Sequence, residues 1–197
     1  MMSSPFSENT GIEEFENAIT EDYEHQVIKR MLEEARWLFS GMIYGYKVTY
    51  TPSDISRSVD RFYKIETLAE LQFGDPRLEL YDTFHEENIY HLFFRYRLDT
   101  YQQKRIDYWN SGVFDSASSY GRYPLFGENS RINSVKDAIR LSLESLLKPE
   151  EFNKPSLIEA EVLLRNIPSI SIDAGVNRAF VKLRVDIKNV QHYLTNN

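Results

Sequence analysis

Cysteine is absent from this chain of 197 residues. Its absence excludes disulfides, zinc sites built from thiolates and cysteine nucleophiles. Long apolar runs are also missing, since no stretch approaches 18 consecutive apolar residues and the first 20 residues lack the basic start and apolar run of a secretory signal. We therefore expect no transmembrane segment. The compartment stays open: periplasmic if a signal peptide has been removed, and cytoplasmic otherwise.

Basic residues are missing from the N-terminal end. Residues 1–24 hold seven acidic side chains and no Lys or Arg, whereas the whole chain has 30 acidic and 23 basic residues. The rest of the chain is therefore formally neutral. We interpret residues 1–19 as an acidic flexible arm, in which Thr10 and Glu13 resemble a capping box that would open a short helix. The 42% content of hydrophobic residues is that of a globular domain and excludes disordered or collagen-like classes.

The hydrophobic rhythm changes from helical to strand-like twice along the chain. In the first half, the spacing of apolar residues predicts a helix over 21–42, then strands over 44–51, 63–73, 78–80 and 90–98. In the second half, it predicts a helix over 134–147, then strands over 158–164, 170–172 and 179–187. This order predicts an α+β fold of antiparallel sheets, each covered by an amphipathic helix.

The two halves share an order of elements, which suggests a tandem repeat of one helix and three strands. Pro76 precedes a short strand and a hairpin in the first half, as Pro168 does in the second. We assign residues 20–109 to a first α+β unit, 110–130 to a loop or linker rich in Ser and Gly, and 131–197 to a second α+β unit. Duplication and chance similarity of amphipathic hairpins both stay open. Two such units would share one sheet or pack their apolar faces together.

The segment Leu38–Asp54, LFSGMIYGYKVTYTPSD, resembles a segment of uncharacterised spirochaete proteins. The helix-plus-hairpin repeat is similar in outline to accessory modules of bacterial envelopes and flagella. The resemblance implies a structural or assembly role outside the cytoplasm. It carries over no functional residue, because none of the matching residues forms a chemical motif.

Motifs for catalysis, cofactors and metals are scarce. The sequence has no phosphate-binding loop, dinucleotide fingerprint, nucleophile elbow or EF-hand, so we expect no cofactor and favour a protein without catalytic residues. His85 and His91 flank an acidic turn, but their spacing does not match a helical zinc motif, and we predict no metal site. Asp99 and Asp186 occupy matching repeat positions and are candidates for an acid and base pair, although exposed strand ends are the favoured interpretation.

Cations and aromatic rings alternate on the most regular predicted strand. Arg95 and Arg97 point to the face opposite Tyr96, so these residues do not build the mixed surface that binds single-stranded RNA. We therefore expect no nucleic-acid binding.

The best site candidate is the aromatic segment between the two units. This segment contains residue types that anchor protein interfaces: Tyr120, Arg122, Tyr123 and Phe126. It also lies in a long predicted loop, and long loops in compact domains usually have a function. The alternative is that its apolar members only fill the junction between the halves. We predict a non-catalytic module that binds other proteins or itself through edge strands, this segment or the acidic arm. The alternative function is a small-molecule binder or enzyme with a pocket between the repeats.

Overall fold

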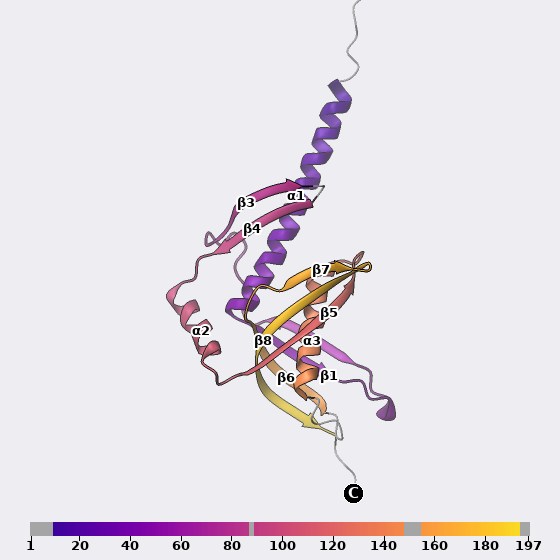
Figure 1. Ribbon diagram of the computed structural model, residues 1–197, viewed down its shortest axis with the longest axis vertical. Helices are drawn as coiled ribbons and strands as arrows, with labels where there is room; N and C mark the ends of the chain where they lie inside the picture. The colour runs from indigo at the N-terminus through magenta and orange to yellow at the C-terminus, as the bar shows by residue number, and fades with distance from the viewer. Residues whose placement is uncertain (1–9, 87–88, 148–154, 194–197) are drawn as a thin grey trace, which may run out of the picture.

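The computed structural model describes residues 10–86, 89–147 and 155–193. Its first half contains α1 (Thr10–Ile43), β1 (Tyr46–Thr51), the 3₁₀ turn η1 (Ile55–Arg57), β2 (Phe62–Thr67), β3 (Leu78–Glu86) and β4 (Ile89–Tyr96). There follow α2 (Thr100–Asn110), β5 (Asp115–Pro124), α3 (Ser130–Leu147), β6 (Pro155–Leu164), β7 (Ser169–Asp173) and β8 (Val176–His192). Figure 1 shows their arrangement. The predicted α+β class with antiparallel sheets is confirmed.

Six strands form one antiparallel sheet in the order β2-β1-β6-β8-β5, with β7 also paired to β8. β6 and β7 run in line along the same side of β8. The break between them holds Pro168, which has no N–H to offer the ladder. The chain then reverses through Ala174 and Gly175, whose φ angles of 48° and 80° lie in the left-handed region used by tight turns. β7 and β8 therefore form a hairpin.

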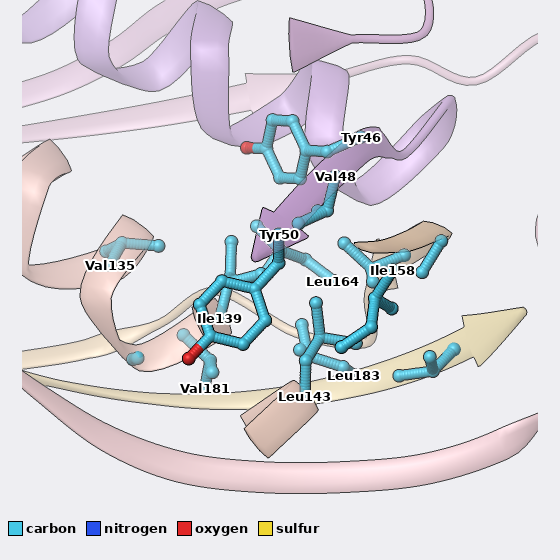
Figure 2. Packing of buried hydrophobic residues seen from close by; sticks show 14 of the residues in the cluster. Tyr46, Val48, Tyr50, Val135, Ile139, Leu143, Ile158, Leu164, Val181 and Leu183 are labelled. Carbon is cyan, nitrogen blue, oxygen red and sulfur yellow. The ribbon is translucent and has the colours of Figure 1, made fainter. Parts of the chain in front are cut away.

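The main core lies between one face of this sheet and α3. β1, β6 and β8 turn alternate apolar side chains to this face, and α3 covers them with an apolar stripe that the sequence predicted. The buried helix residues are Val135, Ala138, Ile139 and Leu143. Figure 2 shows side chains from all four elements converging here. Each fully buried aliphatic side chain contributes about 1.5–3 kcal/mol, so this layer dominates the stability of the domain.

Two tyrosine hydroxyls of the sheet reach α3. Tyr50 Oη donates to the carboxylate of Glu144, which also accepts from Arg140 at 2.5 Å. Burial, reinforced by the Glu144 hydrogen bond, raises the pKa of Tyr50 to about 12. Tyr63 Oη of β2 donates to the carbonyl oxygen of Lys136 at 2.9 Å. Since β2 is one end of the sheet and α3 also packs against β5 at the other end, the sheet curls around α3.

Strands β3 and β4 form a separate two-stranded sheet beside α1 (Figure 1). A polar network ties the base of this hairpin to α2. Arg77 donates to Asp75 at 3.0 Å and to Asp99 at 2.8 Å. Tyr96 Oη donates to Asp75 at 3.0 Å and accepts from the buried Gln102 at 3.0 Å. The hydrogen bonds from Arg77 lower the pKa of Asp75 to about 2, so this carboxylate is charged at neutral pH.

Several segments differ from the predicted elements. The strand expected over 63–73 ends at Thr67, and residues 68–73 belong to no strand. α1 spans Thr10–Ile43 instead of 21–42, so residues 10–19 of the expected arm are helical, while residues 1–9 lie outside the described chain. Ten residues of the loop expected at 110–130 form strand β5. No helix was predicted at α2. The reason is that α2 buries only Gln102 and Trp109, so its sequence lacks the apolar stripe that indicates a helix.

The two predicted units share the main sheet. Tyr46 of β1 pairs with Val162 of β6, so the division between 20–109 and 131–197 does not divide the sheet. The hairpins that suggested a repeat lie in different places, because β3 and β4 stand apart whereas β7 and β8 belong to the main sheet. The duplication therefore stays a prediction.

Among the described residues, no helix combines the length and apolar character that a membrane crossing requires.

Candidate functional site

The four residues predicted to bind a partner lie on and after β5. Tyr120 and Arg122 are exposed on the face of the sheet opposite α3. Tyr123 lies on the other face, which it shares with Gly121, and is half-buried. Phe126 follows the strand and is 97% exposed. The structure therefore brings Tyr120 and Arg122 together and separates the other two from them.

The face of β5 and β8 that points away from α3, here called the open face, carries alternate residues of both strands. On β8 the residues facing α3 are buried, whereas the residues between them are partly or largely exposed. The strand register aligns four cross-strand pairs on the open face: Ser116 with Arg184, Ser118 with Lys182, Tyr120 with Phe180, and Arg122 with Arg178. This face therefore combines two aromatic rings with four cations.

The aromatic residues of the open face hold one of the cations in place. The ring centroids of Tyr120 and Phe180 are 4.7 Å apart. The guanidinium carbon of Arg178 lies 4.1 Å from the centroid of the Tyr120 ring, within the range of a cation–π contact. Lys182 Nζ lies 6.0 Å from the Phe180 centroid, at the outer limit of such a contact. One side of the Tyr120 ring is therefore occupied by Arg178.

The guanidinium and ammonium groups of the four basic residues on the open face have no carboxylate within 4.0 Å among the described residues. Arg184 Nη1 donates instead to Ser116 Oγ at 2.6 Å. The Nε atoms of Arg178 and Arg184 are buried and have no acceptor within the described chain. Farther along β8, by contrast, Lys188 is held by Asp186 at 2.5 Å. Unneutralised cations gathered on one face create a local positive potential despite the net charge of −7.

The outer edge of β5 has no neighbouring strand among the described residues. At one end of this edge, the N–H of Arg122 donates to the carboxylate of Asp137 at 2.9 Å. Backbone groups of an antiparallel strand alternate between its two edges, so Ser116, Ser118 and Tyr120 present theirs to the same outer edge. In the described chain, the N–H groups of Ser116 and Ser118 have no hydrogen-bond partner. The edge is therefore open along the first half of β5 and closed by Asp137 near its end.

Close packing of α3 on the β5 backbone holds this edge in position. A Cβ added at Gly121 would lie 2.1 Å from the backbone nitrogen of Ala138 and 2.3 Å from the carbonyl oxygen of Ser134. Only glycine permits that approach. Ala117 and Ser119, on the same face of β5, are small as well.

The histidines considered for metal binding lie on the β3–β4 hairpin. His91 stacks on Phe84 with ring centroids 4.2 Å apart. The side chains of residues 85–90, which include His85, lie outside the described part of the structure. Among the side chains that are described, no group of three or more His, Asp or Glu residues is placed to hold a metal ion.

The two aspartates considered as an acid and base pair have separate structural roles. Asp99 is the N-cap of α2, and its hydrogen bond from the backbone of Gln102 lowers its pKa. Asp186 forms an ion pair with Lys188. The two carboxylates therefore have separate local partners and do not form a pair with each other.

A groove of about 330 Å³ lies between α1, the β3–β4 hairpin and the second half of the chain. Its lining is mainly apolar and includes Leu38, Phe93 and Ile167. Glu34 and Arg131, which also line it, form an ion pair at 2.9 Å. Ten of its twelve lining residues belong to the first predicted unit, 20–109, so the pocket between the two repeats stays a prediction.

The cations of β8 were not predicted as site residues. Sequence reasoning used the apolar alternation of this strand to predict its buried face. The intervening positions, which are cationic or aromatic, form a second alternation: Arg178, Phe180, Lys182 and Arg184. That second alternation is the signal that identifies the open face.

Comparisons with known proteins agree with the spirochaete resemblance. A protein from Treponema pallidum (strain Nichols), described as "Uncharacterized protein", is 21% identical over 162 residues, which cover 82% of this chain and 68% of that protein. No solved structure matches the chain. A protein-family model matches residues 3–193. The chain therefore belongs to the family defined by that model, an uncharacterised family of spirochaete type.

Proposed function

We propose that this protein is a non-catalytic interaction module that binds an extended segment of another protein along the outer edge of β5. The observation that supports the proposal is the row of unpaired backbone groups at Ser116 and Ser118. A strand added at such an edge gains main-chain hydrogen bonds, while its alternate side chains provide specificity.

The local sequence of β5 suits this role. Edge strands that must avoid pairing usually carry Lys, Pro or a bulge along the edge. Residues 115–119 contain none of these and consist of one Asp, three Ser and one Ala. Since α3 packs directly on Gly121, the edge is a preformed template whose ordering cost on binding is low.

The resemblance carried by Leu38–Asp54 suggests the kind of assembly to which the partner belongs. The helix-plus-hairpin outline of this chain resembles envelope and flagellar accessory modules, so we propose that the partner belongs to such an assembly. Self-association is the version of the proposal in which a second copy supplies the strand.

Proline at Ser118 provides the direct test. Ser118→Pro removes an N–H that points away from β8, so it blocks strand addition without breaking the existing ladder. Ser118→Thr keeps the N–H and serves as the matched control. We expect the tagged wild type and Ser118→Thr to retain the same partner on purification from the native host, and Ser118→Pro to lose it. The free energies of unfolding of all three proteins, measured in urea, should agree within about 0.5 kcal/mol. Equal recovery of the partner with a folded Ser118→Pro would reject the proposal.

A second candidate is binding of an apolar small molecule in the groove beside α1. Its support is the groove of about 330 Å³ with a mainly apolar lining. Titration with a fluorescent fatty acid should then give saturable binding that Leu38→Gln weakens. An absence of saturable binding to the wild type would reject this candidate.

A further inference from the structure

We propose that the segment bound along β5 is acidic, with carboxylates at alternate positions directed over the open face. This inference rests on the proposed strand addition and identifies the chemistry of the partner. Its basis is the placement of the cations on the open face. Lys182 and Arg184 lie beside the open stretch of edge at Ser118 and Ser116, and Arg122 and Arg178 lie next to the end that Asp137 closes.

The geometry of a sheet fixes which side chains of the partner meet these cations. A strand paired with β5 would lie about 5 Å from it and about 10 Å from β8. Alternate side chains of that strand point to the open face. Between them and β8 lie Ser116 and Ser118, whose short side chains leave the path to Lys182 and Arg184 unobstructed. Glutamate and lysine side chains together are long enough to bridge this separation.

Two of the cations are positioned before any ligand arrives. Arg178 lies against the Tyr120 ring at 4.1 Å, and Arg184 is held by Ser116 Oγ at 2.6 Å. Their Nε atoms are buried without an acceptor in the described chain. A carboxylate that approaches from the open side would therefore meet guanidinium groups whose side-chain entropy is already reduced.

The same observations favour an acidic protein segment over a single-stranded nucleic acid. Stacking of bases needs free aromatic faces, but Arg178 covers one side of the Tyr120 ring. The net charge of −7 opposes long-range attraction of a long polyanion, whereas a short acidic strand meets mainly the local cations. The unpaired backbone groups of Ser118 and its neighbours also match a peptide backbone.

Synthetic peptides test the inference directly. The probes are a fluorescent peptide of four Glu-Val repeats and its neutral counterpart of four Gln-Val repeats, followed by anisotropy. We expect the acidic peptide to bind the wild type about tenfold more tightly at about 50 mM salt, and this preference to shrink at about 500 mM salt because exposed charges are screened. Lys182→Met should reduce the preference. Lys47→Met is the matched control, because Lys47 lies on β1 and pairs with Glu159, and this variant should bind like the wild type.

Each other outcome has a distinct meaning. Equal affinity for both peptides, with binding lost in Ser118→Pro, would overturn the acidic inference and leave strand addition standing. Acidic binding that Ser118→Pro does not reduce would overturn strand addition. Tighter binding of a uridine 12-mer than of the acidic peptide would overturn the inference in favour of RNA. If the free wild type dimerises and Ser118→Pro abolishes the dimer, the edge binds a second copy of the chain, and the acidic inference would be overturned as well. Failure of the acidic peptide to bind at millimolar concentration would also overturn it.

Discussion

The substitution Gly121→Ala tests whether β5 is fixed by close packing of α3. The added Cβ would lie 2.1 Å from the backbone nitrogen of Ala138, whereas real Cβ contacts are essentially never under 3.0 Å. The helix must therefore retreat by about 1 Å, which loosens its dispersion contacts with the sheet. Overpacking of a core costs about 1–3 kcal/mol, and the obstacle here is a backbone atom that cannot rotate away. We expect a loss of about 3 kcal/mol, or about 6–12 °C in Tm for a domain of this size.

Urea unfolding followed by circular dichroism measures this loss, and Gly74→Ala is its matched control. Gly74 has a φ of 75° and open space around the Cβ position, so alanine there introduces backbone strain without a clash. That strain costs about 1–2 kcal/mol. We expect a larger loss at Gly121, where φ is not positive and the clash acts alone. A smaller effect of Gly121→Ala than of Gly74→Ala would refute it.

Two further predictions concern the core and the hairpin network. Folding raises the pKa of Tyr50 from its ordinary value of about 10 to about 12. The neutral hydroxyl therefore contributes to the free energy of unfolding in full below about pH 10, and this contribution is lost as the pH rises toward 12. Urea unfolding between these pH values should show a steeper loss for the wild type than for Tyr50→Phe; parallel curves would contradict this assignment. Gln102 is 1% exposed and donates to Tyr44 Oη at 2.7 Å as well as to Tyr96. Gln102→Ala should cost about 2–3 kcal/mol in urea unfolding, and a loss below about 0.5 kcal/mol would contradict a role for the network.

The predictable part of the fold is the part that buries apolar side chains at a regular period. α3, β6 and β8 each follow this rule. β4 follows it only in part, because its alternate side chains Leu92, Phe94 and Tyr96 are half-buried. The existence of all four elements was predicted. α2 breaks the rule, because its buried residues are one amide and one indole. Its start was nevertheless encoded locally, since Asp99 and Gln102 form a capping box. Capping chemistry is thus a better guide than periodicity for a helix attached mainly by polar contacts.

β5 was mistaken for a loop for a different physical reason. Three successive residues on its α3-facing side, Ala117, Ser119 and Gly121, are small because the helix lies directly on the strand. Its other face is open to solvent, so neither face shows an apolar alternation. Tyr120 and Arg122 were selected by residue type, but only the pairing of β5 with β8 brings Phe180 and Arg178 beside them. One sequence does not reveal which strands pair across about 60 residues.

The contrast between the two faces of β5 separates what folding requires from what it leaves free. Packing of α3 explains the small residues on the inner face, and Gly121 in particular. It does not explain Ser116 and Ser118, which lie on the other face and make no contact with that helix through their side chains. Nor does folding require unpaired cations such as Lys182 on β8, since an uncharged polar residue would be solvated equally well there. The fold leaves the residue types at these positions free, so a requirement of ligand binding would determine them. These positions adjoin the stretch of the β5 edge where the backbone N–H groups are unpaired.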